Sequence, residues 1–353
     1  MFNIDNILRK NIKELVPYSS ARDEFKGEAS IFLDANENSY GSPLNRNYNR
    51  YPDPLQWKVK NRLAEIKGVP AKNIFLGNGS DEAIDILFRA FCNPGVDNVI
   101  TLPPTYGMYE VSANINDVEV RKVPLRTDYQ LNMEAIAEAI DEHTRIIFIC
   151  SPNNPTGNSI DRQDIETILA NYNGLVVIDE AYINYSRQKT FIQELTEYSN
   201  LVILQTLSKA WGLAGLRVGM AFASEEIIEI FNKVKPPYNI NEASQELALE
   251  ALQNVDQINN WIKETVAERE KLIAELTQIP FVLKIYPSDA NFILVKTGNP
   301  KGIYSHLVNL GIIVRDRSKV ELCEGCLRIT IGTPQENIEL LNALKSFQES
   351  DKI

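Results

Sequence analysis

Residues 145–182 read RIIFICSPNNPTGNSIDRQDIETILANYNGLVVIDEAY, and this stretch decides the fold. It contains two short apolar runs, Arg145–Cys150 and Leu175–Ile178, with a helical pattern near 161–171 between them. Short apolar runs separated by helical patterns are typical of a largely parallel sheet that is covered by helices on both faces. The stretch therefore predicts a strand–helix–strand unit of such a sheet.

The same alternation extends on both sides of this unit. Further strands are expected at Asn73–Leu76, Asn98–Leu102, Val118–Pro124, Leu201–Gln205 and Arg217–Ala223. After about residue 241 a long helical pattern, Asn241–Ile279, leads into strands and helices that are mixed together. We therefore predict an α/β fold in two parts. A large domain over 45–255 holds a mostly parallel mixed sheet covered by helices, and a smaller α+β domain is formed by 1–44 and 256–353.

The composition excludes several classes of function. The chain has 353 residues, with 36 Lys+Arg against 47 Asp+Glu and a formal charge of −11, which argues against a nucleic-acid surface. With two histidines and a single Cys323-x-x-Cys326 pair, no metal site is expected. Apolar side chains at helical spacing from Phe2 to Leu15 predict an amphipathic N-terminal helix rather than a signal or transit peptide. No apolar run approaches the ~20 residues of a membrane span, so we expect a cytoplasmic protein.

The chemistry is expected in the loops at the carboxyl ends of the strands, where open α/β sheets bind ligands. Gly77–Glu82, GNGSDE, stands between a strand and a helix, and free amides at such a helix start suit a phosphate. Taken alone, the segment more often marks a plain helix cap by Ser80 or Asp81. Ser151–Gly157, SPNNPTG, offers asparagine amide groups at a strand end, although Asn, Pro and Gly also dominate ordinary turns.

Two charged residues follow two further strands. Asp179 ends the apolar run of VVIDEAY, where a buried carboxylate needs a cation, and a structural salt bridge is the alternative. Lys209, in Thr206–Gly219 (TLSKAWGLAGLRVG), becomes a carbonyl nucleophile if it is desolvated, and is otherwise a surface lysine. Arg217 adds a fixed cation in the same segment. A phosphate cradle, an amide donor, a carboxylate and a lysine on successive sheet edges are together what pyridoxal phosphate requires, so we expect this cofactor.

These motifs resemble those of the fold-type I pyridoxal-phosphate-dependent aminotransferases, and the resemblance covers almost the whole chain. SPNNPTG, DEAY, SK and GLR are specific for that superfamily. The segments LVPYSSAR, LDANEN, NRYPDP, PPTYGMY and GCLRITIGT narrow the resemblance to the histidinol-phosphate aminotransferase branch. The resemblance implies the fold-type I architecture, with a large cofactor-binding domain and a smaller α+β domain.

The resemblance also implies a role for each matching residue around the cofactor ring. Lys209 would carry the cofactor as a Schiff base and then move the proton, and Asp179 would pair with the pyridinium nitrogen. Tyr182 and Asn154 would donate to the phenolate oxygen, and Tyr106 would stack on the ring.

A second group of residues is implied at the anionic ends of the ligands. The cofactor, chiefly its phosphate, would meet Ser80, Asp81, Thr206, Ser208 and Arg217. Tyr51 would reach the phosphate from the neighbouring subunit, so the resemblance implies a homodimer with shared sites. The substrate would be bound by Tyr18, Asn36, Arg315 and Arg328.

The reaction that the resemblance implies is transamination in histidine biosynthesis, between glutamate and imidazole-acetol phosphate, giving 2-oxoglutarate and L-histidinol phosphate. One arginine pair then serves a phosphomonoester in one half-reaction and a dicarboxylate in the other, and guanidinium forks suit both anions. Two alternatives on the same scaffold are an aromatic amino-acid aminotransferase and a threonine-phosphate decarboxylase. A non-catalytic regulator is disfavoured, because the acidic chain leaves no room for a DNA-binding module.

Overall fold

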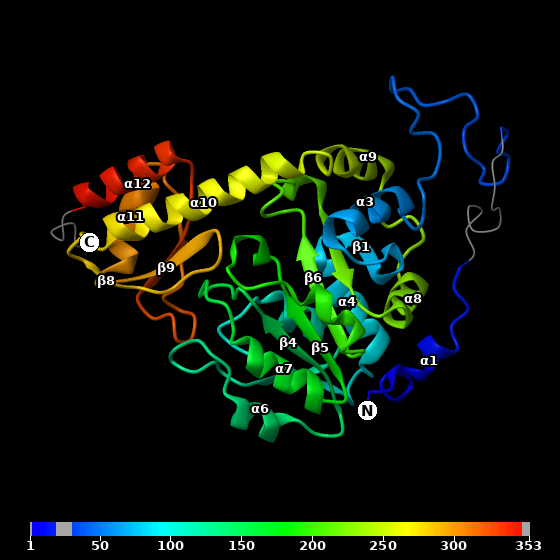
Figure 1. Cartoon of the computed structure of the whole chain (residues 1–353), viewed down its shortest axis with the longest axis horizontal. Coiled ribbons are helices and arrows are strands. Elements are labelled where there is room, and N and C mark those ends of the chain that lie inside the picture. The colour runs from blue at the N-terminus through cyan, green and yellow to red at the C-terminus, as the bar shows by residue number, and fades with distance from the viewer. Residues whose placement is uncertain (1, 19–29, 348–353) are drawn as a thin grey trace.

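A seven-stranded sheet forms the centre of the computed structural model, which describes residues 2–18 and 30–347 (Figure 1). The strand order is β1-β7-β6-β5-β4-β2-β3. β7 is antiparallel to both of its neighbours, and the other pairs are parallel. The strands are β1 Ile74–Asn78, β2 Asn98–Thr101, β3 Glu119–Lys122, β4 Thr144–Cys150, β5 Leu175–Asp179, β6 Leu201–Thr206 and β7 Val218–Phe222. The predicted mostly parallel mixed sheet is therefore confirmed.

Helices cover both faces of this sheet. The core on one face includes side chains from α3 Trp57–Lys67, α6 Met133–Ala139, α7 Arg162–Asn171 and α9 Glu242–Ala251. The core on the other face includes side chains from α4 Ser80–Phe91, α5 Met108–Ile115 and α8 Glu225–Val234. Apart from the edge strand β3, the strands are therefore buried on both sides, which is why they read as apolar runs in the sequence.

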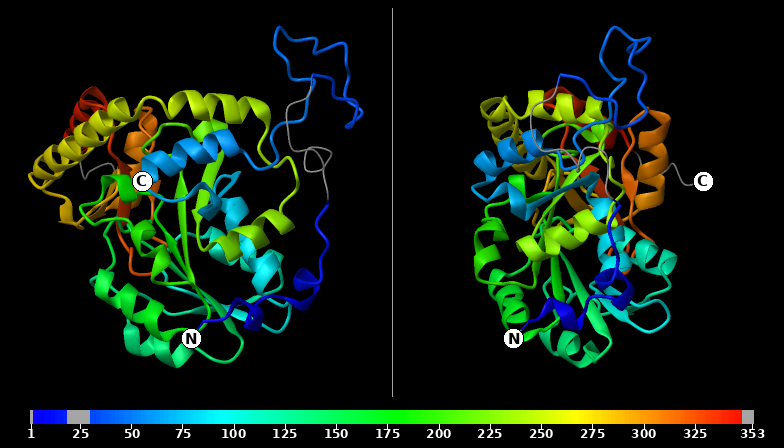
Figure 2. Two further views of the ribbon diagram at one scale, coloured as in Figure 1. Left: turned by 45° about the vertical axis from the view of Figure 1, so that its right-hand side comes forward. Right: turned by 90° about the vertical axis from the view of Figure 1, so that its right-hand side faces the viewer.

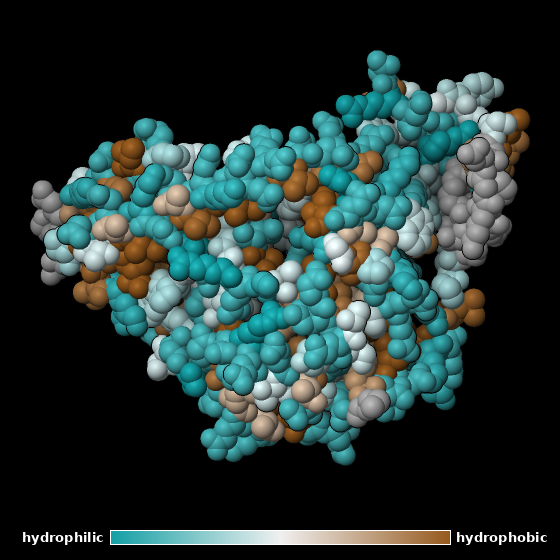
Figure 3. Space-filling model, viewed as in Figure 1, coloured by the Kyte–Doolittle hydropathy of each residue, from teal (hydrophilic) through white to brown (hydrophobic). Residues whose placement is uncertain are grey.

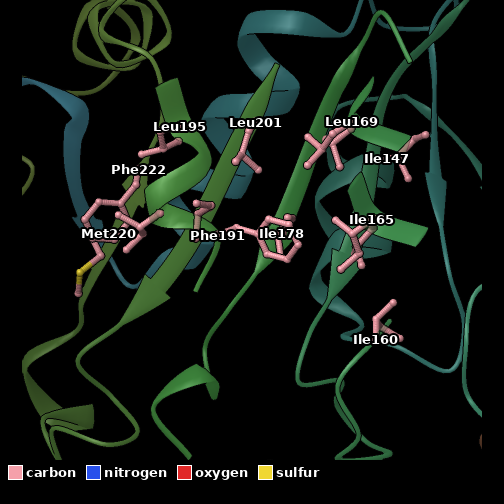
Figure 4. Close-up of a cluster of buried hydrophobic side chains, with 14 of the residues drawn as sticks. Ile147, Ile160, Ile165, Leu169, Ile178, Phe191, Leu195, Leu201, Met220 and Phe222 are labelled. Atoms are coloured by element: carbon pink, nitrogen blue, oxygen red, sulfur yellow. The ribbon is translucent and has the colours of Figure 1, made fainter. Parts of the chain in front are cut away.

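Successive side chains of a buried strand belong alternately to the two cores. In β4, Ile147 and Ile149 belong to one core, whereas Ile146 and Phe148 belong to the other. Figure 4 shows Ile147 in the first core, near Ile165 of α7 and Ile178 of β5. Successive side chains of a strand point to opposite faces, so every residue of the run is used for packing.

A second, antiparallel sheet lies near the C-terminal end of the long helix α10, Val255–Leu276 (Figures 1 and 2). Its order is β10-β11-β9-β8, with β8 Val282–Ile285, β9 Phe292–Thr297, β10 Arg315–Asp316 and β11 Cys326–Thr330. Together with α11 Pro300–Asn309, α12 Pro334–Ser346 and the end of α10, it has a hydrophobic core of its own. The predicted smaller α+β part is therefore confirmed, while the domain boundaries 45–255, 1–44 and 256–353 stay a prediction.

The predicted amphipathic helix at the N-terminus is wrong. The structure has a short 3₁₀ turn, Ile4–Asn6, and one helical turn, α1 Lys10–Lys13. Between them Arg9 bonds to the end of α4, its backbone nitrogen donating to Ala90 O at 3.1 Å and its Nη1 to Arg89 O at 2.7 Å. The apolar residues of the segment still pack inward, with Ile4, Ile7 and Ile12 buried in the core that includes α4 and α8. These bonds to α4 replace the bonds of a continuous helix.

The surface in Figure 3 is mostly hydrophilic on the face shown, with apolar side chains in scattered patches. Over residues 2–18 and 30–347, none of the helices combines the length and the apolar character that crossing a membrane requires.

A close backbone approach between β7 and the turn after β1 places the start of α4. Gly219 of β7 is paired with Gly77 of β1. β1 ends at the next residue, Asn78, and Gly79 then leads into α4. A Cβ atom at Gly219 would lie 2.1 Å from the nitrogen of Ser80 and 2.2 Å from the carbonyl carbon of Gly79. Only glycine lets β7 lie this close to the first residue of α4.

We predict that Gly219→Ala destabilises the protein, because the added methyl group meets backbone atoms that cannot rotate away. Overpacking of this kind costs about 1–3 kcal/mol, to be measured as a fall in the free energy of unfolding by urea. Gly215→Ala is the matched control, because no heavy atom lies within 4 Å of its Cβ position. Equal unfolding curves for the two variants would contradict the close approach.

Candidate active site

A cavity of about 700 Å³ lies at the edge of the large sheet where the parallel strands end. Cys150, Asp179 and Thr206 line it from the last positions of β4, β5 and β6. β7 runs the opposite way, so Arg217, directly before it, reaches the same edge. The smaller sheet closes the cavity with the arginines of β10 and β11. Residues that are far apart in the sequence therefore face one space.

The structure brings most of the predicted site residues together. Those that line the cavity are Ser80, Asp81, Tyr106, Asn154, Asp179, Tyr182, Thr206, Ser208, Lys209, Arg217, Arg315 and Arg328. Tyr18, Asn36 and Tyr51 do not line it. They lie in the N-terminal segment, where Tyr18 is 75% exposed and the ring of Tyr51 stacks on Tyr238 with centroids 4.6 Å apart. Their predicted roles stay predictions.

Asp179 is the most deeply buried charged group of the site, at 3% exposure. Tyr109 donates its hydroxyl to Asp179 Oδ2 at 2.7 Å, and the backbone nitrogen of Ala181 donates to Oδ1 at 3.0 Å. Burial raises the pKa of Asp179, and these two donors oppose the rise. A cation at the open side of this carboxylate would be held strongly, because the site offers little water to compete.

Tyr109 is a residue that the sequence reasoning missed. Its ring is fully buried and stacks on Phe148 of β4 with centroids 4.7 Å apart. The ring is thus fixed by the core while its hydroxyl orients the carboxylate. It belongs to the PPTYGMY segment, one of those that carry the resemblance, but a buried tyrosine gives no signal in sequence that separates such a contact from packing alone.

Lys209 faces the same cavity from the loop after β6. Its Nζ lies 5.6 Å from the centre of the Tyr182 ring. Although the side chain is open to the cavity, partial burial lowers the pKa of Lys209, and Arg328 and Arg217 lower it further against the opposing charge of Asp179. These surroundings favour the neutral, nucleophilic amine more than bulk water does.

The start of α4 forms an anion cradle with Arg217. Gly79 precedes the helix with φ of +73°, and no side chain caps the first turn. A Cβ at Gly79 would lie 2.7 Å from Arg217 Nη2, so glycine leaves room for the guanidinium. Arg217 Nη2 lies 3.7 Å from Asp81 Oδ2, and Tyr106 donates its hydroxyl to Asp81 Oδ1 at 3.1 Å. Free helix amides beside a cation are a typical phosphate site.

These residues fit the pyridoxal phosphate that the resemblance implies. The uncapped helix start and Arg217 suit its phosphate, the buried Asp179 suits its ring nitrogen, and Lys209 has the lowered pKa that a Schiff-base lysine needs.

Arg328 connects this part of the site to the smaller sheet. It donates from Nη1 to Asn154 Oδ1, which leaves the NH₂ group of that amide as the donor towards a ligand. Its guanidinium carbon lies 5.2 Å from the centre of the Phe292 ring, and the same ring packs edge-on against Tyr182. Phe292 of β9 thus supports two site residues, and the sequence reasoning missed it. Arg317, which also lines the cavity, was missed as well.

The family model for aminotransferases of class I and II matches residues 31–344. The chain belongs to this family. Among curated relatives, this aminotransferase is 57% identical to the histidinol-phosphate aminotransferase of Parabacteroides distasonis over 348 residues, covering 99% of this chain and 100% of that protein. It is 56% identical to the histidinol-phosphate aminotransferase of Cytophaga hutchinsonii, covering 98% of this chain and 99% of that protein.

A solved structure has the same fold. The aminotransferase is similar to the histidinol-phosphate aminotransferase of Clostridium acetobutylicum with a TM-score of 0.78 and 26% identity, over 85% of this chain and 90% of that one. The predicted fold-type I architecture is therefore confirmed.

We predict that Arg328→Gln raises the pKa of Lys209, because it removes the neighbouring cation that most disfavours the protonated amine. At a fixed pH below the pKa, less of the amine is then neutral, so pyridoxal phosphate attaches more slowly to the cofactor-free protein. The pH profile of attachment, followed by absorbance, should shift to higher pH. Arg126→Gln is the control, because this exposed arginine pairs with Asp128 and does not line the cavity. An unshifted profile in Arg328→Gln would refute the coupling.

Proposed function

We propose that this aminotransferase uses pyridoxal phosphate to transfer the amino group between glutamate and imidazole-acetol phosphate, forming 2-oxoglutarate and L-histidinol phosphate. The observation that carries the proposal is a single cavity that contains both the Lys209–Asp179 pair and the Arg315–Arg328 pair. Relatives more than half identical over nearly their whole length carry the name histidinol-phosphate aminotransferase, which supports this substrate.

The residues divide the work between holding the cofactor and moving a proton. When bound, pyridoxal phosphate supplies an electron sink for the carbon that loses its proton. Asp179 would keep the ring nitrogen protonated, and Asn154 and Tyr182 would orient the ring by hydrogen bonds. Ser80, Asp81, Thr206, Ser208 and Arg217 would hold the cofactor at its phosphate end. Lys209 Nζ, whose lowered pKa leaves more of the amine neutral and able to accept a proton, would carry the proton.

The arginine pair suits the two different substrates. Arg315 of β10 and Arg328 of β11 are directly opposite in the antiparallel ladder, so their side chains leave the same face of the smaller sheet. Histidinol phosphate offers a phosphate and no α-carboxylate, whereas glutamate offers carboxylates. Two guanidinium groups bind either anion in turn, which a ping-pong reaction requires.

The first experiment mixes the holoenzyme separately with L-histidinol phosphate, phenylalanine and threonine phosphate. The change from pyridoxal to pyridoxamine absorbance is expected with histidinol phosphate and not with phenylalanine. Lys209→Ala should slow the reaction by at least ~100-fold, because general acid–base catalysis contributes about 10²–10⁴. Lys122→Ala, an exposed lysine paired with Glu110, is the control. Release of carbon dioxide from threonine phosphate would favour the decarboxylase instead.

We further propose that the enzyme is a cytoplasmic homodimer in which the N-terminal segment serves the neighbouring site. Figures 1 and 2 show residues 30–50, the blue stretch before α3, extending away from the body of the chain. It carries apolar side chains with high exposure, including Leu33 at 82% and Tyr40 at 103%. Such side chains need a partner surface. A second copy supplies one, and it would bring Tyr51 to the cofactor phosphate and Tyr18 and Asn36 to the substrate.

Mixing two inactive variants tests this arrangement. A dimer of one Lys209→Ala chain and one Tyr51→Ala chain has one site with Lys209 from the second chain and Tyr51 from the first. If Tyr51 crosses between subunits, this site is complete, and mixing under exchange conditions should restore activity well above that of the Tyr51→Ala homodimer. If Tyr51 served its own chain, no complete site would form and mixing would add nothing. Tyr48→Ala in place of Tyr51→Ala is the matched control, because its hydroxyl already donates to Glu246 of the same chain.

A further inference from the structure

A third arginine stands beside the Arg315–Arg328 pair. The backbone nitrogen of Arg317 donates to Cys326 O at 2.9 Å, which continues the β10–β11 ladder by one step. In a strand, residues two positions apart point to the same face. Arg315 and Arg317 therefore share the face of Arg328, and Asp316 points to the other. All three arginines line the cavity.

These three cations lack an ion-pair partner among the residues that the structure describes. Over residues 2–18 and 30–347, no carboxylate forms an ion pair with Arg315, Arg317 or Arg328. The Nε atom of Arg317 is buried and has no hydrogen-bond partner. Burial and the charge of Arg315 lower the pKa of Arg317, and burial and Arg317 lower that of Arg328. Like charges across a ladder are destabilising, so the arrangement is complete only when an anion binds.

We propose that Arg317 is a third arm of the substrate-anion site and that it sets the preference for a phosphomonoester over a carboxylate. The inference rests on the proposed function, and it extends it to a residue that the family resemblance did not supply. A phosphomonoester near neutral pH carries close to two negative charges and three terminal oxygens. A carboxylate carries one charge and two oxygens, which the Arg315–Arg328 pair already satisfies. The third guanidinium is thus used by the phosphate alone.

The test compares the two half-reactions in holoenzyme variants at saturating pyridoxal phosphate. Arg317→Gln removes the charge and should raise KM for L-histidinol phosphate by ~10–100-fold, as expected for losing one charge-assisted hydrogen bond. KM for glutamate should change less than ~3-fold, and kcat should change little. Arg317→Lys keeps the charge without the fork and should recover part of the loss. Lys319→Gln, an exposed cation in the same loop that does not line the cavity, should match the wild type.

Inorganic phosphate separates this inference from the choice of substrate. It should inhibit the glutamate half-reaction of the wild type, and Arg317→Gln should require at least ~10-fold more phosphate for the same inhibition. The wild type could fail to convert histidinol phosphate while Arg317→Gln still requires more phosphate for inhibition. That result would contradict the proposed substrate but support the role of Arg317. If Arg317→Gln weakens both substrates equally, or phosphate inhibits both proteins alike, the role of Arg317 is overturned. Unfolding curves that match the wild type exclude a folding defect.

Discussion

The burial of one carboxylate organises this site. Asp179 ends the central strand β5 at 3% exposure, where a charge without partners would cost several kcal/mol. The structure meets that cost with two donors, Tyr109 and the backbone nitrogen of Ala181, and with the nearby positive charge of Lys209. Tyr109 is in turn held by Phe148, whose ring also stacks on Phe88 of α4. The packing of the hydrophobic core therefore fixes the tyrosine that positions the Asp179 carboxylate.

The charge of the cavity is the reverse of the charge of the chain. The protein carries a formal charge of −11, yet Lys209, Arg217, Arg315, Arg317 and Arg328 line one cavity with only Asp81 and Asp179 as acids. The excess of cations lies where the proposed ligands carry phosphate and carboxylate groups. Net charge describes the solvated surface, whereas the field inside a narrow site depends on which few side chains the fold aims into it.

The sequence predicted the strands of the large sheet directly, whereas the amphipathic helix α8 was not predicted. The central strands β4, β5 and β6 appear where the apolar runs predicted them, because strands buried on both faces leave no polar positions to hide the pattern. The short helix α5, Met108–Ile115, was not predicted, because eight residues barely cover two turns. The N-terminal helix was predicted from a real apolar period. Bonds from Arg9 to the end of α4 replaced it, and no local pattern indicates such a contact.

The sequence by itself determined the fold class and the strand-end residues that meet at the cavity from parallel strands, including Asp179 and Lys209. Their types and their positions after apolar runs are local properties, and parallel strands necessarily bring their carboxyl ends to one edge. Only the tertiary structure decided that Tyr109 orients Asp179, that Phe292 supports both Tyr182 and Arg328, and that Arg317 lines the cavity beside Arg315 and Arg328. The alternation Arg315-Asp316-Arg317 was visible in the sequence. Its meaning depends on a cross-strand register with Arg328, which is fixed by long-range pairing and not by neighbouring residues.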